Sequence, residues 1–292
     1  MTDDHDPSVT DDAFGVALAA ARRAAASAPA GLFTDLDGTL APIVRDPSSV
    51  RLQPGAANAL AELAEQLAVV CVVSGRAAMD VRNLVEVPAL LIAGNHGIEW
   101  LEPNAAEPVA APHLAGVPEA MDQLLAAVPG LPGVRVDDKR LSATVHFRNA
   151  ADPAAARRAI LAALEDALRS GVAGETGVEL REGRMSVELR PREAGDKGSA
   201  VSAAAERFGL RGLIVLGDDL TDLDMFREAA RLRDAGSLRA AIIAVGGGSE
   251  VPPQVSAAAD ALLDGPAAVV RLLSAVAAGA ARRSPPGRPS GG

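Results

Sequence analysis

Short apolar runs alternate with Ala- and Leu-rich stretches along most of this 292-residue chain, and this alternation constrains the fold more than any other feature. The apolar runs are residues 31–33, 68–73, 89–93, 213–216 and 241–245. The helix-like stretches are residues 56–66, 77–85, 199–208 and 222–232. Because strands that are apolar throughout must be covered on both faces, the alternation predicts an α/β fold with a doubly wound parallel sheet. Ligands bind such sheets beyond the carboxyl ends of the strands.

The middle of the chain follows a different pattern. Helices are expected over residues 118–128 and 153–168, and each precedes a hairpin, over 134–138 with 141–148 and over 178–181 with 185–189. This order predicts an inserted α+β unit that acts as a cap over the substrate. We therefore expect a core domain of residues 13–108 and 189–283 around a cap domain of residues 109–188. Residues 1–12, which are acidic, and 284–292, which are rich in Pro and Gly, are expected to be disordered tails.

Composition excludes several classes of partner. The net charge of −10 argues against nucleic acid and anionic membranes, because both require a basic face. The single cysteine, Cys71, cannot form an internal disulfide and is expected in the core. No apolar run approaches the roughly 20 residues that span a bilayer, and the N-terminus does not read as a signal peptide. These features predict a cytoplasmic protein that acts on a small molecule.

The strongest chemical signal directly follows the first apolar run. Asp35 and Asp37 stand two residues apart and are followed by Gly38, which permits a sharp turn close to a ligand. Asp35 is suited to attack a phosphoryl group with one oxygen while the other holds Mg²⁺. Asp37 is suited to protonate the leaving oxygen and then to activate water. The pair therefore predicts catalysis of phosphoryl transfer.

Three further signals follow later strands or open helices. Ser74 and Gly75 end a strand and precede a helix, a position where a hydroxyl and backbone amides bind phosphate. Lys197 opens another helix and would supply a positive charge for phosphoryl oxygens. An acidic cluster that includes Asp218, Asp219 and Asp222 follows the fourth run and suits Mg²⁺, a hard cation that prefers carboxylate oxygens.

These elements, in this order, resemble the haloacid-dehalogenase superfamily, and finer motifs resemble its trehalose-6-phosphate phosphatase family. The matching motifs are DLDGTLAPI (35–43), SGR (74–76), GNHGIE (94–99), Lys139 with HFR (146–148), ELRP (188–191), DKG (196–198) and GDDLTD (217–222). The resemblance covers residues 32–273. It implies a Rossmann-like core, a mobile α+β cap, Mg²⁺ as cofactor, and hydrolysis of trehalose 6-phosphate through an aspartyl phosphate.

The resemblance also implies the roles of particular residues. Mg²⁺ would be held by Asp35, the backbone carbonyl of Asp37 and Asp218, with Asp219 and Asp222 in an outer shell. The expected substrate-binding residues are Arg76, Asn95, His96, Lys139, Arg148, Arg184 and Glu188. Even spacing also predicts that Ser142, His146 and Arg148 share one face of a cap strand.

Two alternatives to a trehalose-6-phosphate phosphatase remain open, and two residues depart from the family pattern. The substrate could instead be a sucrose phosphate or a mannosyl-phosphoglycerate, or the chain could be a non-catalytic partner of a trehalose-phosphate synthase. A synthase is also the expected protein partner of an active enzyme. Leu223 stands where the family usually has Glu, and Gly195 stands where it tends to have an aromatic residue.

Overall fold

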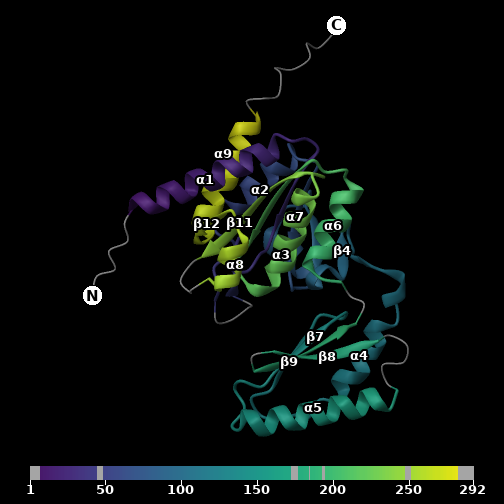
Figure 1. The fold of residues 1–292 in the computed structure, drawn as a ribbon. Coiled ribbons are helices and arrows are strands. Elements are labelled where there is room, and N and C mark those ends of the chain that lie inside the picture. Colours follow the sequence, from purple (N-terminus) through teal and green to yellow (C-terminus); the bar gives the residue numbers. More distant parts are fainter. Residues whose placement is uncertain are drawn as a thin grey trace, which may run out of the picture. The chain divides into compact units, whose positions relative to one another are not determined.

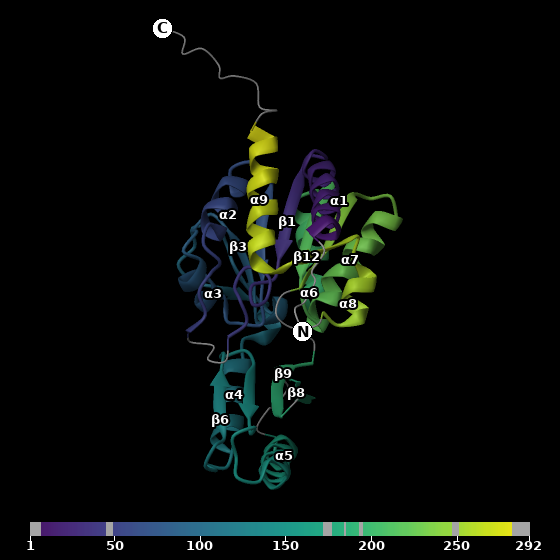
Figure 2. The same ribbon diagram turned by 90° about the vertical axis from the view of Figure 1, so that its left-hand side faces the viewer.

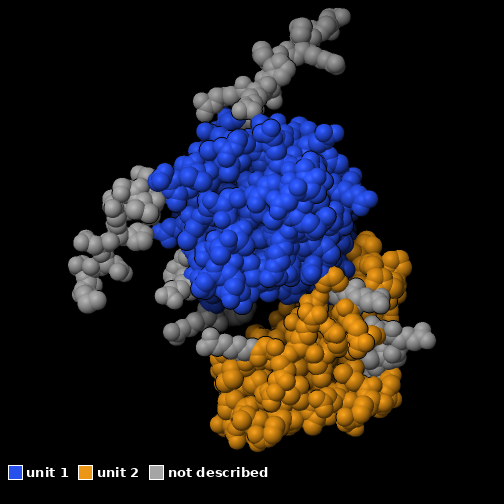
Figure 3. Space-filling model, in the orientation of Figure 1, with its two compact units in different colours: residues 1–108, 196–292 blue, residues 109–195 orange. Residues whose placement is uncertain are grey.

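A computed structural model describes residues 7–44, 49–171, 177–183, 185–192, 195–246 and 251–281. The chain divides into two compact units, drawn blue and orange in Figure 3. Unit 1 comprises residues 1–108 and 196–292, and unit 2 is the inserted segment of residues 109–195.

The core of unit 1 is a sheet that grows outward from β1 in both directions. Its strand order is β12-β11-β10-β1-β2-β3-β4, and all neighbouring pairs are parallel except β3 with β4. The strands are β1 (Ala30–Thr34), β2 (Val69–Val73), β3 (Leu91–Gly94), β4 (Glu99–Leu101), β10 (Gly212–Gly217), β11 (Arg239–Gly246) and β12 (Ala261–Asp264). The chain builds β2 and β3 on one side of β1 and β10 to β12 on the other, so the topology switches between β1 and β10.

Helices cover both faces of this sheet, as Figure 1 shows. Neighbouring residues of each central strand enter opposite cores: Leu32 packs on one face with α1, α2, α3 and α9, and Phe33 packs on the other with α6, α7 and α8. This alternation is the period of two that a strand imposes. The helices are α1 (Pro7–Ala25), α2 (Ala56–Ala64), α3 (Ala78–Val85), α6 (Lys197–Arg207), α7 (Leu223–Asp234), α8 (Pro253–Ala258) and α9 (Gly265–Ala281). Two 3₁₀ turns, Asn95–Gly97 and Leu220–Asp222, lie among them.

Unit 2 has its own antiparallel sheet in the order β6-β7-β9-β8. Its elements are β5 (Val109–Ala110), a 3₁₀ turn (Pro112–Leu114), α4 (Val117–Ala126), β6 (Arg135–Asp138), β7 (Ala143–His146), α5 (Pro153–Arg169), β8 (Val178–Gly183) and β9 (Ser186–Pro191). Val145 and Val187 pair across the sheet and are fully buried, as is Ile160 of α5. Figure 2 shows these helices beside the small sheet. One face of the sheet therefore packs on helices, while its other face carries polar residues.

The predicted α/β class with a parallel sheet is confirmed, and the differences concern boundaries. Residues 7–12, expected in the acidic tail, form the first turns of α1, which begins at Pro7, and proline is favoured at the first position of a helix. The unit boundary after 195 lies beyond the expected 188, because β9 continues to Pro191 and pairs with β8. Three elements of unit 1, α8, α9 and β12, were not predicted from the sequence. Residues 1–6 and 284–292 of the expected tails lie outside the described residues.

Among the described residues, none of the helices combines the length and the apolar character that crossing a lipid bilayer requires.

The start of β10 fits so closely against the end of α1 that only glycine is accommodated there. A Cβ atom at Gly212 would lie 2.0 Å from the carbonyl oxygen of Ala24, whereas a Cβ atom at Gly15 would meet nothing within 4 Å. We expect Gly212→Ala to lower the free energy of unfolding by about 1–3 kcal/mol, because backbone must move. Gly15→Ala should leave it unchanged or raise it by up to ~1 kcal/mol. Urea unfolding of both variants measures this, and equal stabilities would contradict the packing described.

Candidate active site

The candidate site lies at the carboxyl edge of the unit 1 sheet, at its topological switch point. Asp35 directly follows β1 and Asp218 directly follows β10, and these two strands are parallel neighbours. Ser74 follows β2, which pairs with β1 on its other side. Because the carboxyl ends of parallel strands meet at one edge, the topology brings these side chains from three distant segments together.

Lys197 joins two of the acidic segments through a buried contact. Its Nζ donates hydrogen bonds to Asp35 Oδ1 and to Asp222 Oδ1, each at 2.7 Å. All three side chains are at least nine-tenths buried. Lys197 is the first residue of α6, which Asp196 caps by accepting a hydrogen bond from the Ser199 backbone amide. The cap therefore determines where the α6 lysine enters the site.

Asp222 is occupied by structural contacts on both oxygens. Its Oδ1 accepts from Lys197, and its Oδ2 accepts from the backbone amides of Asp218 and Asp219 at 2.9 and 3.1 Å. These bonds shape the loop that presents the Asp218 side chain. The carboxylate of Asp218 lies so close to Gly38 that a Cβ atom there would be 2.1 Å from Oδ2. A side chain at position 38 would therefore displace Asp218, which explains the glycine in DLDG.

The carboxylates of Asp35, Asp218 and Asp222 form a group that could hold a metal ion, with one oxygen of each within 4.8 Å of the others. Three carboxylates and one lysine leave a surplus of negative charge in a buried place. Burial and nearby carboxylates raise the pKa of Asp218 to about 7, and burial raises the pKa of Asp35 well above its usual value despite Lys197. Burial alone would lower the pKa of Lys197, but Asp35 and Asp222 outweigh burial and raise it.

These observations fit a divalent cation. Asp222 has both oxygens engaged, whereas among the described residues no donor reaches Asp35 Oδ2. Asp218 accepts a long hydrogen bond, 3.3 Å from the hydroxyl of the buried Thr39, and no other donor within the described part of the chain reaches its carboxylate. Asp35 and Asp218 are therefore the carboxylates left to bind a cation, which matches the one or two that Mg²⁺ takes from a protein.

Asp37 does not join this carboxylate group. Both of its oxygens accept from Arg76, with Nε to Oδ2 at 2.7 Å and Nη2 to Oδ1 at 2.8 Å. This fork geometry is the strongest arrangement for an arginine and a carboxylate. Arg76, which we expected to bind substrate, therefore forms a salt bridge with Asp37, the expected acid–base residue, in this structure.

The GNHGIE motif contacts and stabilises the loop of residues Ser74, Gly75 and Arg76. His96 donates its backbone N–H to the Ser74 carbonyl at 2.8 Å, and its ring lies 2.6 Å from where a Cβ atom of Gly75 would be. The buried Glu99 accepts from the Asn95 side chain at 2.8 Å and from the Ala78 backbone amide at 2.7 Å. Asn95 is fully buried and is part of this network.

Glu99 and Thr39 make contacts in the site for which no role was predicted from the sequence. Glu99 stands four residues after Asn95 in the quoted motif, and an acidic residue within a strand-like segment is the signal that could have indicated a buried hydrogen-bonded role. Thr39 gives no comparable signal, because threonine is common in turns.

Four of the expected substrate-binding residues belong to the inserted segment of residues 109–195: Lys139, Arg148, Arg184 and Glu188. Glu188 lies on the polar face of β9, opposite Thr144 of β7. Lys139 lies in the turn before β7, 4.0 Å from Asp137. Arg148 was expected on a strand but lies in a turn beyond the end of β7. It therefore does not share a strand face with His146, as its even spacing had predicted. Arg184 lies outside the described residues.

The two departures from the family pattern have local explanations. Leu223 is buried in the apolar core between the sheet and α7, where a charged side chain would be unsatisfied. Gly195 has φ of +70°, a backbone conformation that an aromatic residue adopts only with strain. Arg190 donates a hydrogen bond to the Gly195 carbonyl at 2.5 Å, which holds this conformation.

The fold and the site define a protein of the haloacid-dehalogenase superfamily. Its features are a doubly wound sheet, Asp-x-Asp after β1, a lysine at the start of a helix and an acidic loop after β10. Residues 33–256 match the sequence model of the trehalose-phosphatase family. The chain belongs to that family.

Several relatives and solved structures resemble this chain. It is 36% identical over 208 residues to a trehalose-phosphate phosphatase of Mycobacterium avium, covering 67% of this chain and 50% of that protein. It is 40% identical over 215 residues to an uncharacterized glycosyl hydrolase of Mycobacterium tuberculosis, covering 70% of this chain and 16% of that protein. The chain therefore spans half or less of the length of these relatives.

The structural comparison gives the same fold. The C-terminal domain of the Candida albicans trehalose-6-phosphate phosphatase superimposes with a TM-score of 0.65 at 22% identity, covering 89% of this chain and 96% of that one. The Aspergillus fumigatus trehalose-6-phosphate phosphatase superimposes with a TM-score of 0.60 at 26% identity, covering 90% and 97%.

The raised pKa of Asp218 predicts a pH-dependent response to divalent cations. Without a cation, the folded chain holds the Asp218 proton up to pH of about 7, whereas the unfolded chain releases it near the usual 3.8. Stability should therefore fall as pH rises from about 4 to about 7, by at most roughly 1.4 kcal/mol per pH unit. Because a cation displaces this proton, added Mg²⁺ should raise the melting temperature more at pH 8 than at pH 5.

Thermal unfolding with EDTA and with Mg²⁺ at both pH values measures this effect. Asp218→Asn removes a proposed cation ligand, so the Mg²⁺ effect on its melting temperature should be small at both pH values. An equal Mg²⁺ effect at both pH values in the unmodified chain would contradict the cation site.

Proposed function

We propose that this chain is a Mg²⁺-dependent phosphatase that hydrolyses trehalose 6-phosphate to trehalose and inorganic phosphate through an aspartyl phosphate on Asp35. The observation that carries this proposal is the buried contact of Lys197 with Asp35, beside Asp218 at the sheet edge. It orients a carboxylate next to a fixed positive charge, as attack on a phosphoryl group requires. The family match and the names of the relatives support the choice of substrate.

The first step uses Asp35 as the nucleophile. Its carboxylate oxygen forms a bond to phosphorus while the bond from phosphorus to the sugar oxygen breaks. Asp37 gives a proton to that departing oxygen, so trehalose leaves as a neutral alcohol. When bound at Asp35 and Asp218 and at the backbone carbonyl of Asp37, Mg²⁺ supplies charge neutralisation for the phosphoryl oxygens. Lys197 and Ser74 would contact the same oxygens.

The second step regenerates Asp35. Water attacks phosphorus, its proton passes to Asp37, and the bond from phosphorus to the Asp35 oxygen breaks, which releases inorganic phosphate. Asp37 thus ends in the protonated form that the next cycle needs. Since Arg76 occupies both Asp37 oxygens in this structure, Asp37 must leave Arg76 during the cycle, and the phosphoryl group offers the guanidinium an alternative anionic partner.

We assign recognition of the sugar to two polar residues of unit 2, Lys139 and Glu188. Both side chains carry hydrogen-bonding groups on or beside the face of the small sheet that is not packed on helices. The non-catalytic alternative is disfavoured, because Asp35, Lys197 and Asp218 keep the arrangement that catalysis needs.

The nucleophile assignment predicts the effect of a single substitution. Asp35→Asn should lower kcat by about 1,000-fold or more, because the amide cannot form the ester with phosphorus. The melting temperature should change little, since Lys197 keeps its bond to Asp222. Asp234→Asn, the same change at an exposed residue near the end of α7, is the control and should retain full activity. Phosphate release close to the unmodified rate by Asp35→Asn would refute the role of Asp35.

The proposed substrate is tested by phosphate release from a panel of esters, with Mg²⁺ and with EDTA. We expect kcat/KM to be highest for trehalose 6-phosphate, and activity to be lost with EDTA. Glucose 6-phosphate, sucrose 6-phosphate and mannosyl-phosphoglycerate are the comparisons. Lys139→Glu should lower kcat/KM for the disaccharide ester more than for glucose 6-phosphate. A preference for another ester would reject the substrate, and undiminished activity with EDTA would reject the cofactor.

A further inference from the structure

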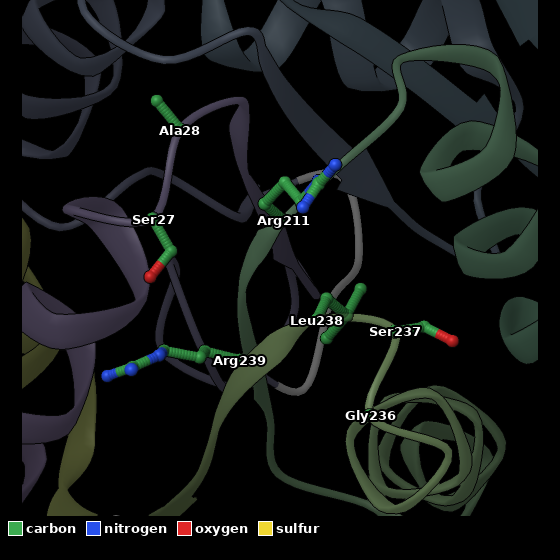
Figure 4. Close-up of a pocket in the computed structure, with 7 residues that line it drawn as sticks. All are labelled: Ser27, Ala28, Arg211, Gly236, Ser237, Leu238 and Arg239. Carbon is green, nitrogen blue, oxygen red and sulfur yellow. The ribbon is translucent and has the colours of Figure 1, made fainter.

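Two adjoining hollows lie at the amino ends of the unit 1 strands, opposite the candidate active site. The first, about 490 Å³, is lined by Ser27, Ala28, Arg211, Gly236, Ser237, Leu238 and Arg239. The second, about 450 Å³, is lined by Arg22, Arg23, Ala26, Ser27 and Arg239. We call the second one the basic hollow. Figure 4 shows Arg239 extending toward Ser27 at the end of α1, while Arg211 extends to the other side.

The basic hollow is lined by positive charges, although the net charge of the protein is negative. Three of its five lining residues are arginines and none is acidic, although acidic residues outnumber basic ones in the chain by 38 to 28. Among the described residues, no carboxylate forms an ion pair with Arg22, Arg23, Arg211 or Arg239. In contrast, Arg76, Arg157, Arg207 and Arg231 all pair with acidic side chains.

Capping of α1 does not account for these arginines. The last carbonyl groups of the helix accept from the chain itself: Arg22 O from the Ala26 amide, Ala24 O from the Ser27 amide, and Arg23 O from the Ser27 hydroxyl. The Arg22 side chain donates to the Ala275 carbonyl of α9 at 3.0 Å. The side chains of Arg23 and Arg239, both exposed, therefore remain available to a ligand.

We propose that the basic hollow binds a small anion that carries two or more phosphate charges, such as pyrophosphate or a diphosphate ester. Planar guanidinium groups bind phosphate oxygens in pairs, and several of them around one hollow favour a ligand with several negative charges. The hollow is therefore opposite in sign to the net charge of the chain, which is −10.

This site is separate from the catalytic one. Arg239 begins β11, and Arg211 directly precedes β10, whose six residues end just before Asp218. At about 3.3 Å per residue, the strand places the two sites about 20 Å apart. The inference does not depend on the proposed phosphatase activity.

The test is calorimetric titration of the full chain with inorganic pyrophosphate, in EDTA and at low salt. Arg23→Gln with Arg239→Gln removes two charges from the hollow and should weaken binding at least tenfold. Arg158→Gln with Arg169→Gln removes the same charge from α5 of unit 2 and should bind within about twofold of the unmodified chain. The catalytic edge can also attract an anion through Lys197, so the difference between the two double variants reports on the hollow.

Four results would overturn the proposal. One is equal pyrophosphate affinity in both double variants, and another is binding no tighter than that of chloride at matched ionic strength. Tighter binding of hexaglutamate than of pyrophosphate would assign the hollow to an acidic protein segment. Sedimentation with phosphatidylinositol-phosphate vesicles that is lost in Arg23→Gln with Arg239→Gln would assign the phosphate to a membrane surface.

Discussion

The buried contact of Lys197 with Asp35 and Asp222 is the interaction on which the site depends. It connects the end of β1, the start of α6 and the turn before α7, three segments that are far apart in the sequence. A buried charge is tolerated only when it is paired and hydrogen-bonded. Lys197 therefore requires at least one of the two carboxylates, and the loss of its side chain would leave both without their shared cation at the sheet edge.

The four acidic residues of the site divide their tasks through their hydrogen bonds. Asp222 shapes the loop after β10, because both of its oxygens accept from protein donors. Asp35 and Asp218 belong to the group of carboxylates that could hold a metal ion, and we propose that they bind the cation and the phosphoryl group. Asp37 is held by Arg76. Identical side chains thus make different contacts because their surroundings differ, and burial together with nearby carboxylates raises the pKa of Asp218.

Much of this arrangement could be predicted from patterns in the sequence. The apolar runs predicted the parallel sheet, because only strands covered on both faces lack polar residues. DLDG after the first run and GDD after the fourth predicted that Asp35 and Asp218 would share an edge, because the carboxyl ends of parallel strands coincide. The helix expected from residue 199 begins at Lys197 in the structure, where Asp196 and Ser199 form a reciprocal cap.

The sequence by itself determined the central strands, most of the helices beside them and the charged residues at their ends, since these follow from local periodicity and turn chemistry. Only the tertiary structure decided which charges meet. The bidentate bond of Arg76 to Asp37, the double engagement of Asp222 and the gathering of Arg23 with Arg239 each join residues from separate segments. Such contacts depend on strand order and side-chain packing, and a one-dimensional pattern contains neither.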